Sequence, residues 1–368
     1  MSIKYRHYKY IHFFYHDDLK FNPRIVEMVN DRDNGFDANE HLFITPYKHV
    51  YDAISKYDNV ILYDTSKPSS ARMINEYAEI GNWLIIHSLP IWYETLKIKR
   101  KYRGKIIWRT WGHEFGYLTP KSNQPAKNFV KKIVSALIKR EINQFRAVGI
   151  ANAVDELDIR ERFGEVPTFE LNYPTKNSDK ALKEARDNNI AERDVTNVLI
   201  GHSGHPVDNH IGIVDALEKY KDERIQLYFI LSYGNEEYIK RVKEYIKDSW
   251  GEKATVISDF MPYADFLKFC ATMDIAIFDG PKSYALGNVG ALLFLEKKLF
   301  LRRDGVLCRA FIKDNIPFNC TDEIENMSFE EFTKKLKYSN KTSSSLYEKS
   351  YREYIENWHI ALSALTCE

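Results

Sequence analysis

Short apolar runs alternate with longer amphipathic stretches along most of the chain. The runs are nearly continuous in Val, Ile, Leu, Phe and Tyr, which is typical of strands buried on both faces of a parallel sheet. The predicted strands are Tyr10–Tyr15, Leu42–Thr45, Val60–Asp64, Trp83–His87, Lys105–Arg109, Ala147–Asn152, Thr168–Asn172, Val198–Gly201, Ile225–Ser232, Thr255–Ser258, Ile275–Phe278 and Leu299–Arg302. Helical segments between them include Pro23–Asn30, Asn128–Phe145, His210–Tyr220, Glu236–Asp248 and Tyr263–Ala271. This alternation predicts an α/β protein with parallel sheets and right-handed crossovers.

The pattern divides at residues 176–196, a highly charged segment that follows the turn-like Tyr173-Pro174-Thr175. We predict a Rossmann-like domain over residues 1–175, a linker over 176–196 and a second Rossmann-like domain over 197–342. Aromatic residues at helical spacing predict a final helix in 343–368 that packs back on the body. Two doubly wound domains place the carboxyl ends of both sheets beside a common cleft, where α/β proteins bind ligands.

Composition narrows the class of protein. The 368 residues fit two domains, and 44% of them are hydrophobic, enough for packed cores. The formal net charge of +1 gives no reason to expect a nucleic-acid partner. The four cysteines form no C-x-x-C pair and are expected as buried thiols. No run is typical of a signal peptide or a membrane span, so we expect a cytoplasmic protein, peripheral to the inner face of the cytoplasmic membrane.

Two glycine-containing segments in the second domain each follow a predicted strand and open a helix. They are Gly201-His202-Ser203-Gly204 and Leu286-Gly287-Asn288. Glycines let the backbone approach a ligand closely, and a helix start offers N–H groups that suit a phosphate. The alternative for the first is a tight strand-to-helix turn with Asp208 or Asn209 as helix cap, and for the second it is helix-start glycines that allow close packing. Two such segments in one domain favour a nucleotide diphosphate site. Its expected contacts are Gly201, Ser203, Gly204, Gly287 and Asn288, with His210 and Lys282 as sources of positive charge.

An aromatic segment follows the strand Lys105–Arg109 of the first domain. Trp108, Arg109 and Trp111 are expected to bind a sugar or an acceptor, because aromatic rings pack on the apolar faces of sugars while polar groups fix the hydroxyls. The alternative is an aromatic turn at the edge of the core.

The same region offers general bases. Deprotonation of an acceptor hydroxyl needs a group within hydrogen-bond reach, and Glu114 is the first candidate, with His113 beside it. His87, at the end of a predicted buried strand, is a second candidate, although a lone histidine there is more often structural.

The start of the chain carries polar residues after its first strand. His12, Asp17 and Asn22 are expected to line the cleft and contact the substrate. His12 and His16 lack the spacing of metal ligands on a helix, and the tripeptide Asp31-Arg32-Asp33 is interpreted as a solvated loop. No metal is therefore expected.

Two basic segments are candidates for contact with a membrane. Lys97–Lys105 holds six basic and no acidic residues, and we favour an anionic membrane surface or acceptor as its partner. Lys127–Arg146 is a basic amphipathic helix, for which packing on its own sheet with a solvated basic face is favoured over membrane contact.

In this order, the segments resemble glycosyltransferase family 56, the TDP-N-acetylfucosamine:lipid II N-acetylfucosaminyltransferases. The resemblance runs from about Ile11 to Phe318, and departures at His113 and His202 leave the sugar open. The residues that match the family's motifs are Ile11, His12, Asp17 and Asn22; His87; Trp108, Trp111, Gly112 and Glu114; Tyr173-Pro174-Thr175; Ile200, Gly201, Ser203, Gly204, His210 and Ile211; and Leu286-Gly287-Asn288.

The resemblance implies a GT-B fold, no metal or other cofactor, a TDP-linked sugar donor held by the C-terminal domain, and a polyprenyl-diphosphate-linked acceptor held by the N-terminal domain at the inner membrane. We expect transfer of a deoxy or acetamido sugar to a lipid-linked or polysaccharide acceptor in envelope glycan synthesis, such as O-antigen. Two alternatives remain open: a non-catalytic nucleotide- or glycan-binding protein that keeps this fold, and a sugar-nucleotide epimerase.

Overall fold

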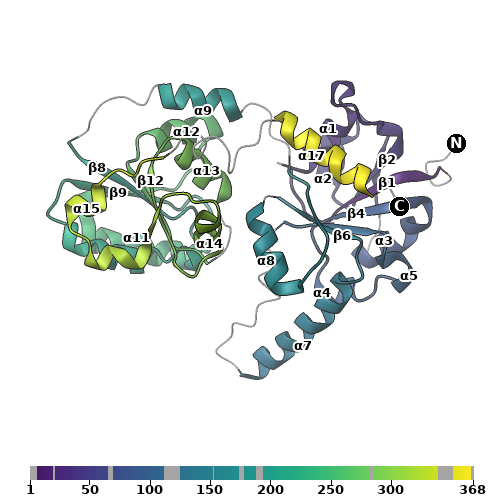
Figure 1. Cartoon of the computed structure of the whole chain (residues 1–368), viewed down its shortest axis with the longest axis horizontal. Helices are drawn as coiled ribbons and strands as arrows, with labels where there is room; N and C mark the ends of the chain where they lie inside the picture. Colours follow the sequence, from purple (N-terminus) through teal and green to yellow (C-terminus); the bar gives the residue numbers. More distant parts are fainter. Residues whose placement is uncertain are drawn as a thin grey trace. The chain divides into compact units, whose positions relative to one another are not determined.

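The computed structural model describes residues 6–19, 21–64, 69–111, 125–151, 153–173, 178–187, 194–281, 285–338 and 351–365. The chain divides into two units (Figure 1). The first unit comprises Met1–Lys176 and Tyr351–Glu368, and the second comprises Asn177–Ser350. The C-terminal helix thus belongs with the N-terminal half of the chain.

The first unit is built on a seven-stranded parallel sheet with strand order β3-β2-β1-β4-β5-β6-β7. Its strands are β1 (Tyr8–Phe14), β2 (His41–Thr45), β3 (Val60–Leu62), β4 (Gly81–His87), β5 (Ile106–Arg109), β6 (Ala147–Ile150) and β7 (Thr168–Glu170). The order reverses between β1 and β4. Such a switch point is where open α/β sheets bind ligands, beyond the carboxyl ends of the strands.

Helices cover both faces of this sheet, because successive strand residues point to opposite sides. Ile11 and Phe13 pack with α3, α7 and α8, whereas Tyr10 and Phe14 pack with α1, α2 and α17. In Figure 1 the C-terminal helix, in yellow, lies beside α1 and α2. The helix bounds are α1 (Asn22–Asn30), α2 (Lys48–Ile54), α3 (Ser70–Tyr77), α4 (Trp92–Thr95), α5 (Arg100–Arg103), α7 (Pro125–Ile142), α8 (Ala153–Phe163) and α17 (Tyr351–Ala364).

The second unit repeats the topology with six parallel strands in the order β10-β9-β8-β11-β12-β13. They are β8 (Thr196–Ile200), β9 (Ile225–Ile230), β10 (Ala254–Ile257), β11 (Ile275–Phe278), β12 (Lys298–Leu301) and β13 (Asn319–Cys320). The switch point lies between β8 and β11. The two parallel sheets with their crossover helices confirm the predicted α/β class.

Local sequence signals account for the helices of the second unit. At α11, Asn235 accepts a hydrogen bond from the backbone of Tyr238, and buried Val242, Ile246 and Trp250 recur every fourth residue. Helix α9 lies inside the segment for which the sequence suggested a linker, and its buried Leu182 shows that it packs on the second unit against α12. The remaining bounds are α9 (Ser178–Asp187), α10 (His210–Leu217), α11 (Glu236–Trp250), α12 (Tyr263–Ala271), α13 (Leu286–Phe294), α14 (Val306–Lys313) and α15 (Phe329–Thr333).

Candidate active site

The switch point of the first unit gathers buried polar atoms. Phe14 and His87 are register partners at the ends of β1 and β4, so Tyr15 and Ser88 leave the sheet side by side. The Tyr15 hydroxyl and Ser88 Oγ are both buried without a hydrogen-bond partner among the described residues, as is Oδ1 of Asn22. Because buried polar groups are almost always satisfied in native proteins, these atoms make the switch point a candidate site for a polar ligand.

Three histidines form a hydrogen-bonded file across one face of this sheet. His12 Nε2 lies 2.9 Å from His41 Nδ1, and His12 Nδ1 lies 3.1 Å from His87 Nε2. The register places the three side chains on the same face, in a diagonal from the start of β2 to the end of β4. Trp358 of α17 covers them, stacking with His87 at 6.3 Å between ring centroids.

Burial keeps these rings neutral. Removal from water lowers the pKa of His12 and of His87 well below the usual value, and it lowers the pKa of His41 to about 3. Electrostatic repulsion lowers two of these pKa values further. Arg109 lowers the pKa of His87, and the other two rings lower the pKa of His12. His12 has no exposed surface. It therefore holds His87 through a hydrogen bond from the interior and is not accessible to a substrate, contrary to its expected role.

His87 reaches the carboxyl edge of the sheet through Tyr173. The Tyr173 hydroxyl lies 3.4 Å from His87 Nδ1, the ring nitrogen that does not face His12. A neutral imidazole has one donor and one acceptor nitrogen. If Nε2 of His87 donates to His12, Nδ1 is left as the acceptor, which is the arrangement a general base requires.

Arg109, Trp111 and Tyr173 form an aromatic and cationic cluster beyond the end of β5. The Arg109 guanidinium lies 3.4 Å from the centre of the Tyr173 ring, and its Nε donates to Leu171 O at 2.9 Å. Trp111 packs edge-on to Tyr173, with 5.0 Å between centroids. The geometry brings these two predicted substrate residues, Arg109 and Trp111, together at the carboxyl edge.

Other predicted substrate residues lie elsewhere. Trp108 is fully buried and packs edge-on to Phe163 in the core, because its neighbour Arg109 takes the opposite face of β5. Asp17 lies at the surface, half-exposed, and pairs with His49. Asn22 opens α1 and donates to His16 O at 3.0 Å. His113, Glu114 and Lys282 lie outside the described residues.

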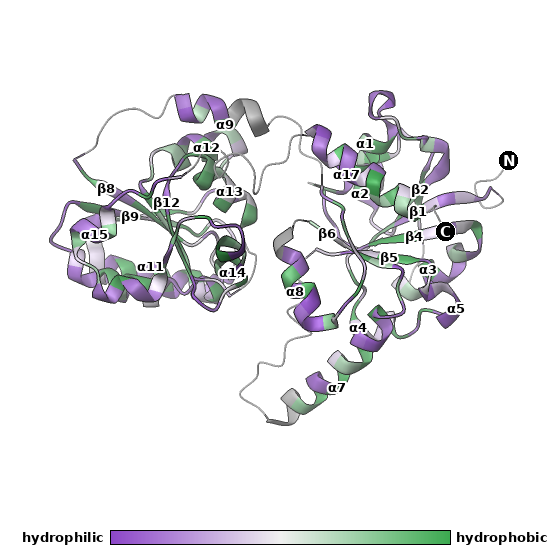
Figure 2. Ribbon diagram, in the orientation of Figure 1, coloured by the Kyte–Doolittle hydropathy of each residue, from purple (hydrophilic) through white to green (hydrophobic). Residues whose placement is uncertain are grey.

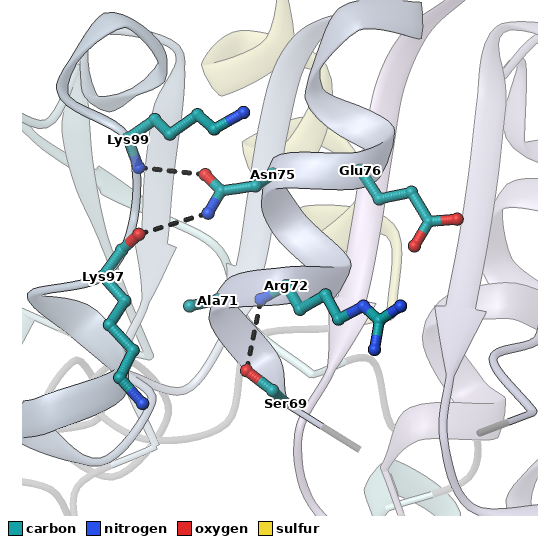
Figure 3. A pocket seen from close by; sticks show the side chains of 7 residues that line it. All are labelled: Ser69, Ala71, Arg72, Asn75, Glu76, Lys97 and Lys99. Atoms are coloured by element: carbon teal, nitrogen blue, oxygen red, sulfur yellow. Dashed lines mark hydrogen bonds between the residues drawn. The ribbon is translucent and has the colours of Figure 1, made fainter. Parts of the chain in front are cut away.

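Two hollows open along this side of the first unit. The larger, about 420 Å³, lies beside α3, where Asn75 accepts from the Lys99 backbone N–H and donates to Lys97 O (Figure 3). The smaller, about 270 Å³, lies beyond the ends of β1, β2 and β3 and is lined in part by Tyr15, Tyr47 and Tyr63. Sequence reasoning missed these three tyrosines, although each lies at or near the end of a predicted strand. They suit a sugar or another partly apolar ligand.

In the second unit, the glycines after β8 are required by packing. Gly201 has φ +69°, and a Cβ there would lie 2.5 Å from His210 Nε2. A Cβ on Gly204 would lie 2.2 Å from Ile239 Cγ1, because this loop pairs with the loop after β9 at Gly234. Close packing of this turn therefore explains both glycines, whereas the sequence offered a tight turn capped by Asp208 or Asn209 as the alternative.

Asp208 occupies the predicted phosphate loop. Its carboxylate accepts from the Ser203 backbone N–H at 3.0 Å and from Ser203 Oγ at 2.8 Å, and it pairs with His202 Nδ1 at 2.8 Å. Burial acts to raise the pKa of Asp208, but the hydrogen bonds from His202 and Ser203, with the charge of His202, leave that pKa below its ordinary value. Ser203 is fully buried, so its donors hold the loop's own carboxylate and are not available to a phosphate.

His210 lies beneath that loop. Burial lowers its pKa to about 4, so the ring is neutral at pH 7 and carries no charge to offset a diphosphate. Its Nδ1 lies 3.3 Å from the Tyr238 hydroxyl, and its Nε2 is buried without a hydrogen-bond partner among the described residues.

The start of α13 is open. Gly287 is exposed, and a Cβ there would meet no atom within 4 Å. Ala285, the residue before the helix, has φ +59° and provides no side-chain cap. The first N–H groups of a helix and its dipole attract anions. Arg302, which follows β12 and pairs with Asp304 at 2.5 Å, is a cation at the same carboxyl edge that sequence reasoning missed.

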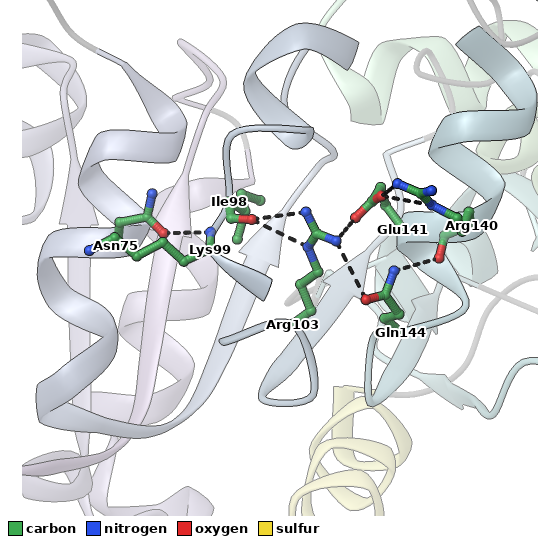
Figure 4. Close-up of polar contacts among 7 residues, drawn as sticks. All are labelled: Asn75, Ile98, Lys99, Arg103, Arg140, Glu141 and Gln144. Carbon is green, nitrogen blue, oxygen red and sulfur yellow. Dashed lines mark hydrogen bonds and ion pairs between the residues drawn. The ribbon is translucent and has the colours of Figure 1, made fainter. Parts of the chain in front are cut away.

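The basic segment Lys97–Lys105 is largely engaged by its own unit. Lys97 pairs with Glu94 at 2.8 Å, Lys101 pairs with Glu79 at 2.6 Å, and Lys105 Nζ donates to Gly81 O at 2.9 Å. The buried Arg103 pairs with buried Glu141 of α7 and donates twice to Ile98 O (Figure 4). Four of its six cations are thus bound within the protein, and the segment offers an anionic surface less charge than its sequence indicates.

Arg103 gives a test of this interpretation. Arg103→Ala is expected to lower the free energy of unfolding by about 2 kcal/mol, because it leaves Glu141 buried with only Arg140 beside it. Urea unfolding measures the change. The double variant R103M/E141L should recover most of the loss. A single variant as stable as the wild type would show that Arg103 has no structural role.

The described residues offer one group of possible metal ligands, Cys320, Asp322 and Glu323. Both carboxylates pair with Arg303, at 2.6 Å and 3.1 Å. The Asp31 side chain accepts from the Asp33 backbone and starts a short 3-10 turn. No helix in the described part of the chain is long and apolar enough to cross a membrane.

The family model of glycosyl transferase group 56, described as 4-alpha-L-fucosyltransferase, matches residues 42–366, which span both units. The chain belongs to this family. Family 56 membership makes it a glycosyltransferase, an enzyme that binds a nucleotide-sugar donor and an acceptor. It also decides against the epimerase and the non-catalytic protein that the sequence left open.

Solved structures share the fold of this family 56 chain at low identity. A glycosyltransferase from Rickettsia africae is 10% identical with a TM-score of 0.59, the alignment covering 98% of this chain and 99% of that one. Anabaena HepE, solved with UDP and glucose, is 10% identical with a TM-score of 0.59, covering 97% and 100%. Sucrose-phosphate synthase from Thermosynechococcus elongatus is 10% identical with a TM-score of 0.55, covering 97% of each chain. The fold is therefore GT-B, as expected. Comparison with curated protein sequences gives no match.

Proposed function

We propose that this glycosyltransferase moves a deoxy or acetamido sugar from a nucleotide diphosphate, TDP-linked, to a polyprenyl-diphosphate-linked acceptor in bacterial envelope glycan synthesis. The observation that carries the proposal is the family 56 match across both units. The family's description as a fucosyltransferase supports a deoxy sugar as the group transferred.

The donor diphosphate binds at the start of α13 in the second unit. HepE, which shares the fold, was solved with UDP, and this supports a nucleotide diphosphate as the ligand. Gly287 and Asn288 present helix N–H groups to the phosphates, and Arg302 with Lys282 supplies positive charge as the sugar leaves. No metal is required in this scheme. Gly201, Ser203, Gly204 and His210 shape the neighbouring loop through Asp208 and act on the donor indirectly.

The acceptor binds at the switch point of the first unit. Trp111 and Tyr173 pack on sugar rings, and the unpartnered Tyr15 hydroxyl, beside the smaller hollow, binds a polar group. Glu114 removes the proton of the acceptor hydroxyl as the new glycosidic bond forms. His87, behind Tyr173, is the second candidate for that step.

Gly287 allows a clean test of the donor site. Gly287→Glu places a carboxylate in open space at a helix start, where it stabilises the helix but repels a diphosphate. We expect an unchanged or slightly higher melting temperature and about a tenfold loss of TDP affinity. Gly104→Glu, also in open space but in the first unit, is the matched control. Wild-type affinity in G287E would exclude the start of α13 as the phosphate site.

The nucleotide and the acceptor need separate assays. A thermal-shift screen across TDP-, UDP- and GDP-sugars identifies the nucleotide, and stabilisation by TDP-sugars above the others is expected. Radiolabelled sugar transfer to a polyprenyl-diphosphate-linked acceptor tests the reaction. Stabilisation by UDP- or GDP-sugars alone would overturn the TDP assignment. Donor binding without transfer to any lipid-linked or polysaccharide acceptor would overturn the proposed acceptor.

A further inference from the structure

Helix α7 carries an apolar stripe of which only one half is covered. Val130, Val134, Ile138 and Ile142 recur every fourth residue and lie on one side of the helix. Ile138 and Ile142 are fully buried in the core, and Val134 is partly buried against it. Val130 remains 58% exposed. The stripe therefore continues past the edge of its unit into solvent.

Further apolar side chains surround the uncovered half. On α7, Phe129 is 66% exposed and Ile133 is 46% exposed. Helix α4 contacts α7, and Ile91, Trp92 and Tyr93 at its start are exposed as well. Figure 2 shows apolar residues along α7 where it extends away from the sheet of its unit. We call these six exposed residues of α4 and α7 the apolar patch.

Along α7, the charge around the apolar patch has one sign up to residue 140. No acidic residue occurs between 125 and 140, whereas Lys131, Lys132 and Lys139 lie on α7 itself. Lys132 is exposed. Trp and Tyr are the aromatic residues enriched where proteins meet the headgroup region of a bilayer, and the patch contains one of each. An apolar face with a basic surround fits an anionic lipid surface.

The α4 part of the apolar patch also lies near the edge of the sheet that holds the acceptor site. Trp92, the first residue of α4, follows His87 by five residues, and α7 is the helix that succeeds β5. Helix α4 therefore starts near the carboxyl edge of the strands, where Tyr15, Ser88 and Trp111 follow their strands. A protein that docks through this patch holds its acceptor site close to the surface it is docked on.

We propose that the apolar patch docks the enzyme onto the anionic surface of a membrane. Phe129, Val130, Ile133 and Trp92 enter the headgroup region, while Lys131 and Lys132 contact anionic lipid headgroups. The inference rests on the proposed lipid-linked acceptor. A second copy of this chain fits less well, because its patch would bring the same positive charge. Lys97–Lys105 contributes little, since four of its six cations are paired.

Co-sedimentation of the full chain with vesicles tests the docking. Vesicles of phosphatidylcholine with 30% phosphatidylglycerol are expected to bind the wild type at low salt, and pure phosphatidylcholine to bind it weakly. The triple variant F129S/V130S/I133S should lower the partition coefficient about tenfold or more, and K131E/K132E should abolish the preference for the anionic lipid. All the apolar positions are exposed, so the fold should be retained, as circular dichroism checks.

Matched controls lie on other surfaces. I312S/I360S removes two exposed isoleucines, 63% and 64% exposed, and should bind vesicles like the wild type. K99E/R100E changes the cations of the other basic segment and should have a small effect. Equal vesicle binding by wild type and the triple variant, or no binding by the wild type, would overturn the proposal. So would a dimer of the wild type in light scattering that the triple variant loses.

Activity separates this inference from the proposed function. With a short water-soluble acceptor, the triple variant should transfer sugar at the wild-type rate, and with the acceptor embedded in anionic vesicles it should be about tenfold slower. Loss of transfer by the wild type in both assays, with vesicle binding intact, would overturn the proposed function and leave the docking surface standing.

Discussion

Lowering the pH from 7 to 5 is expected to destabilise the first unit, by about 2 kcal/mol through His41 alone and further through His12 and His87. The cause is the buried file of His41, His12 and His87. An exposed histidine in the unfolded chain has a pKa of about 6.5, whereas the folded unit holds the pKa of all three rings lower. Below pH 6.5 the unfolded chain therefore binds protons that the folded chain does not.

The direction and the size of the stability change follow from this difference in the number of bound protons. Stability rises with pH wherever the unfolded state binds more protons, so it falls as the pH drops from 6.5 toward the folded pKa, which for His41 is about 3. His41 contributes about 1.4 kcal/mol per pH unit, or about 2 kcal/mol between pH 6.5 and 5, and His12 and His87 add to this loss in the same direction. The charges near the file are Arg109 at His87, and Asp37, Lys9 and His359 at His41. Asp37 alone favours protonation, and burial outweighs it.

Urea unfolding at pH 7, 6 and 5, followed by tryptophan fluorescence, measures the effect. The readout is the slope of stability against pH, which is independent of any loss that a substitution causes at pH 7. His12→Asn should lower that slope, because it removes a ring whose pKa is lower in the folded unit than in the unfolded chain. His7→Asn, at an exposed position, should leave the slope unchanged. A first unit equally stable at pH 7 and pH 5 would contradict the neutral file.

The fold could be predicted from the sequence because buried parallel strands leave a strong local signal. Eleven of the twelve predicted strands overlap most of an observed strand. The twelfth, Thr168–Asn172, overlaps the short β7 at its start. The two-residue β13 was missed, since no periodicity can show in so few residues. The packing of α17 on the face of the histidine file depends on contacts of Trp358 with His12 and His87, which lie far away in the sequence and which pattern alone does not reveal.

The candidate site was predicted less well, for two physical reasons. Successive side chains of β5 point to opposite faces of the sheet, so Trp108 faces the core on the side away from Arg109 and Trp111. Counting alternate residues along this strand would have predicted that Trp108 is buried. Asp208 was considered only as a helix cap, yet it fills the loop after β8 from a short 3-10 turn. A glycine loop that binds phosphate and one that binds its own carboxylate have the same sequence pattern. Only the position of that carboxylate separates them.

Removal of the general base is expected to have the other large effect, a loss of turnover. Glu114→Gln should lower turnover by about 10²-fold or more while nucleotide affinity stays nearly unchanged, because an acceptor hydroxyl is a poor nucleophile without a base. The glutamine keeps the size of the side chain and removes only its basicity. Glu165→Gln, at a side chain that is 84% exposed, is the matched control and should be fully active.

His87→Ala should reduce turnover less than Glu114→Gln. The His87 ring is 1% exposed, so an acceptor hydroxyl reaches it only through the Tyr173 hydroxyl at 3.4 Å. Tyr173→Phe cuts that path and leaves the ring in place. If His87→Ala and Tyr173→Phe both abolish turnover while Glu114→Gln retains it, His87 is the base and Tyr173 carries the proton to it. If the three variants stay active, His113→Asn and then Asp17→Asn are next, because buried His12 has no access to an acceptor.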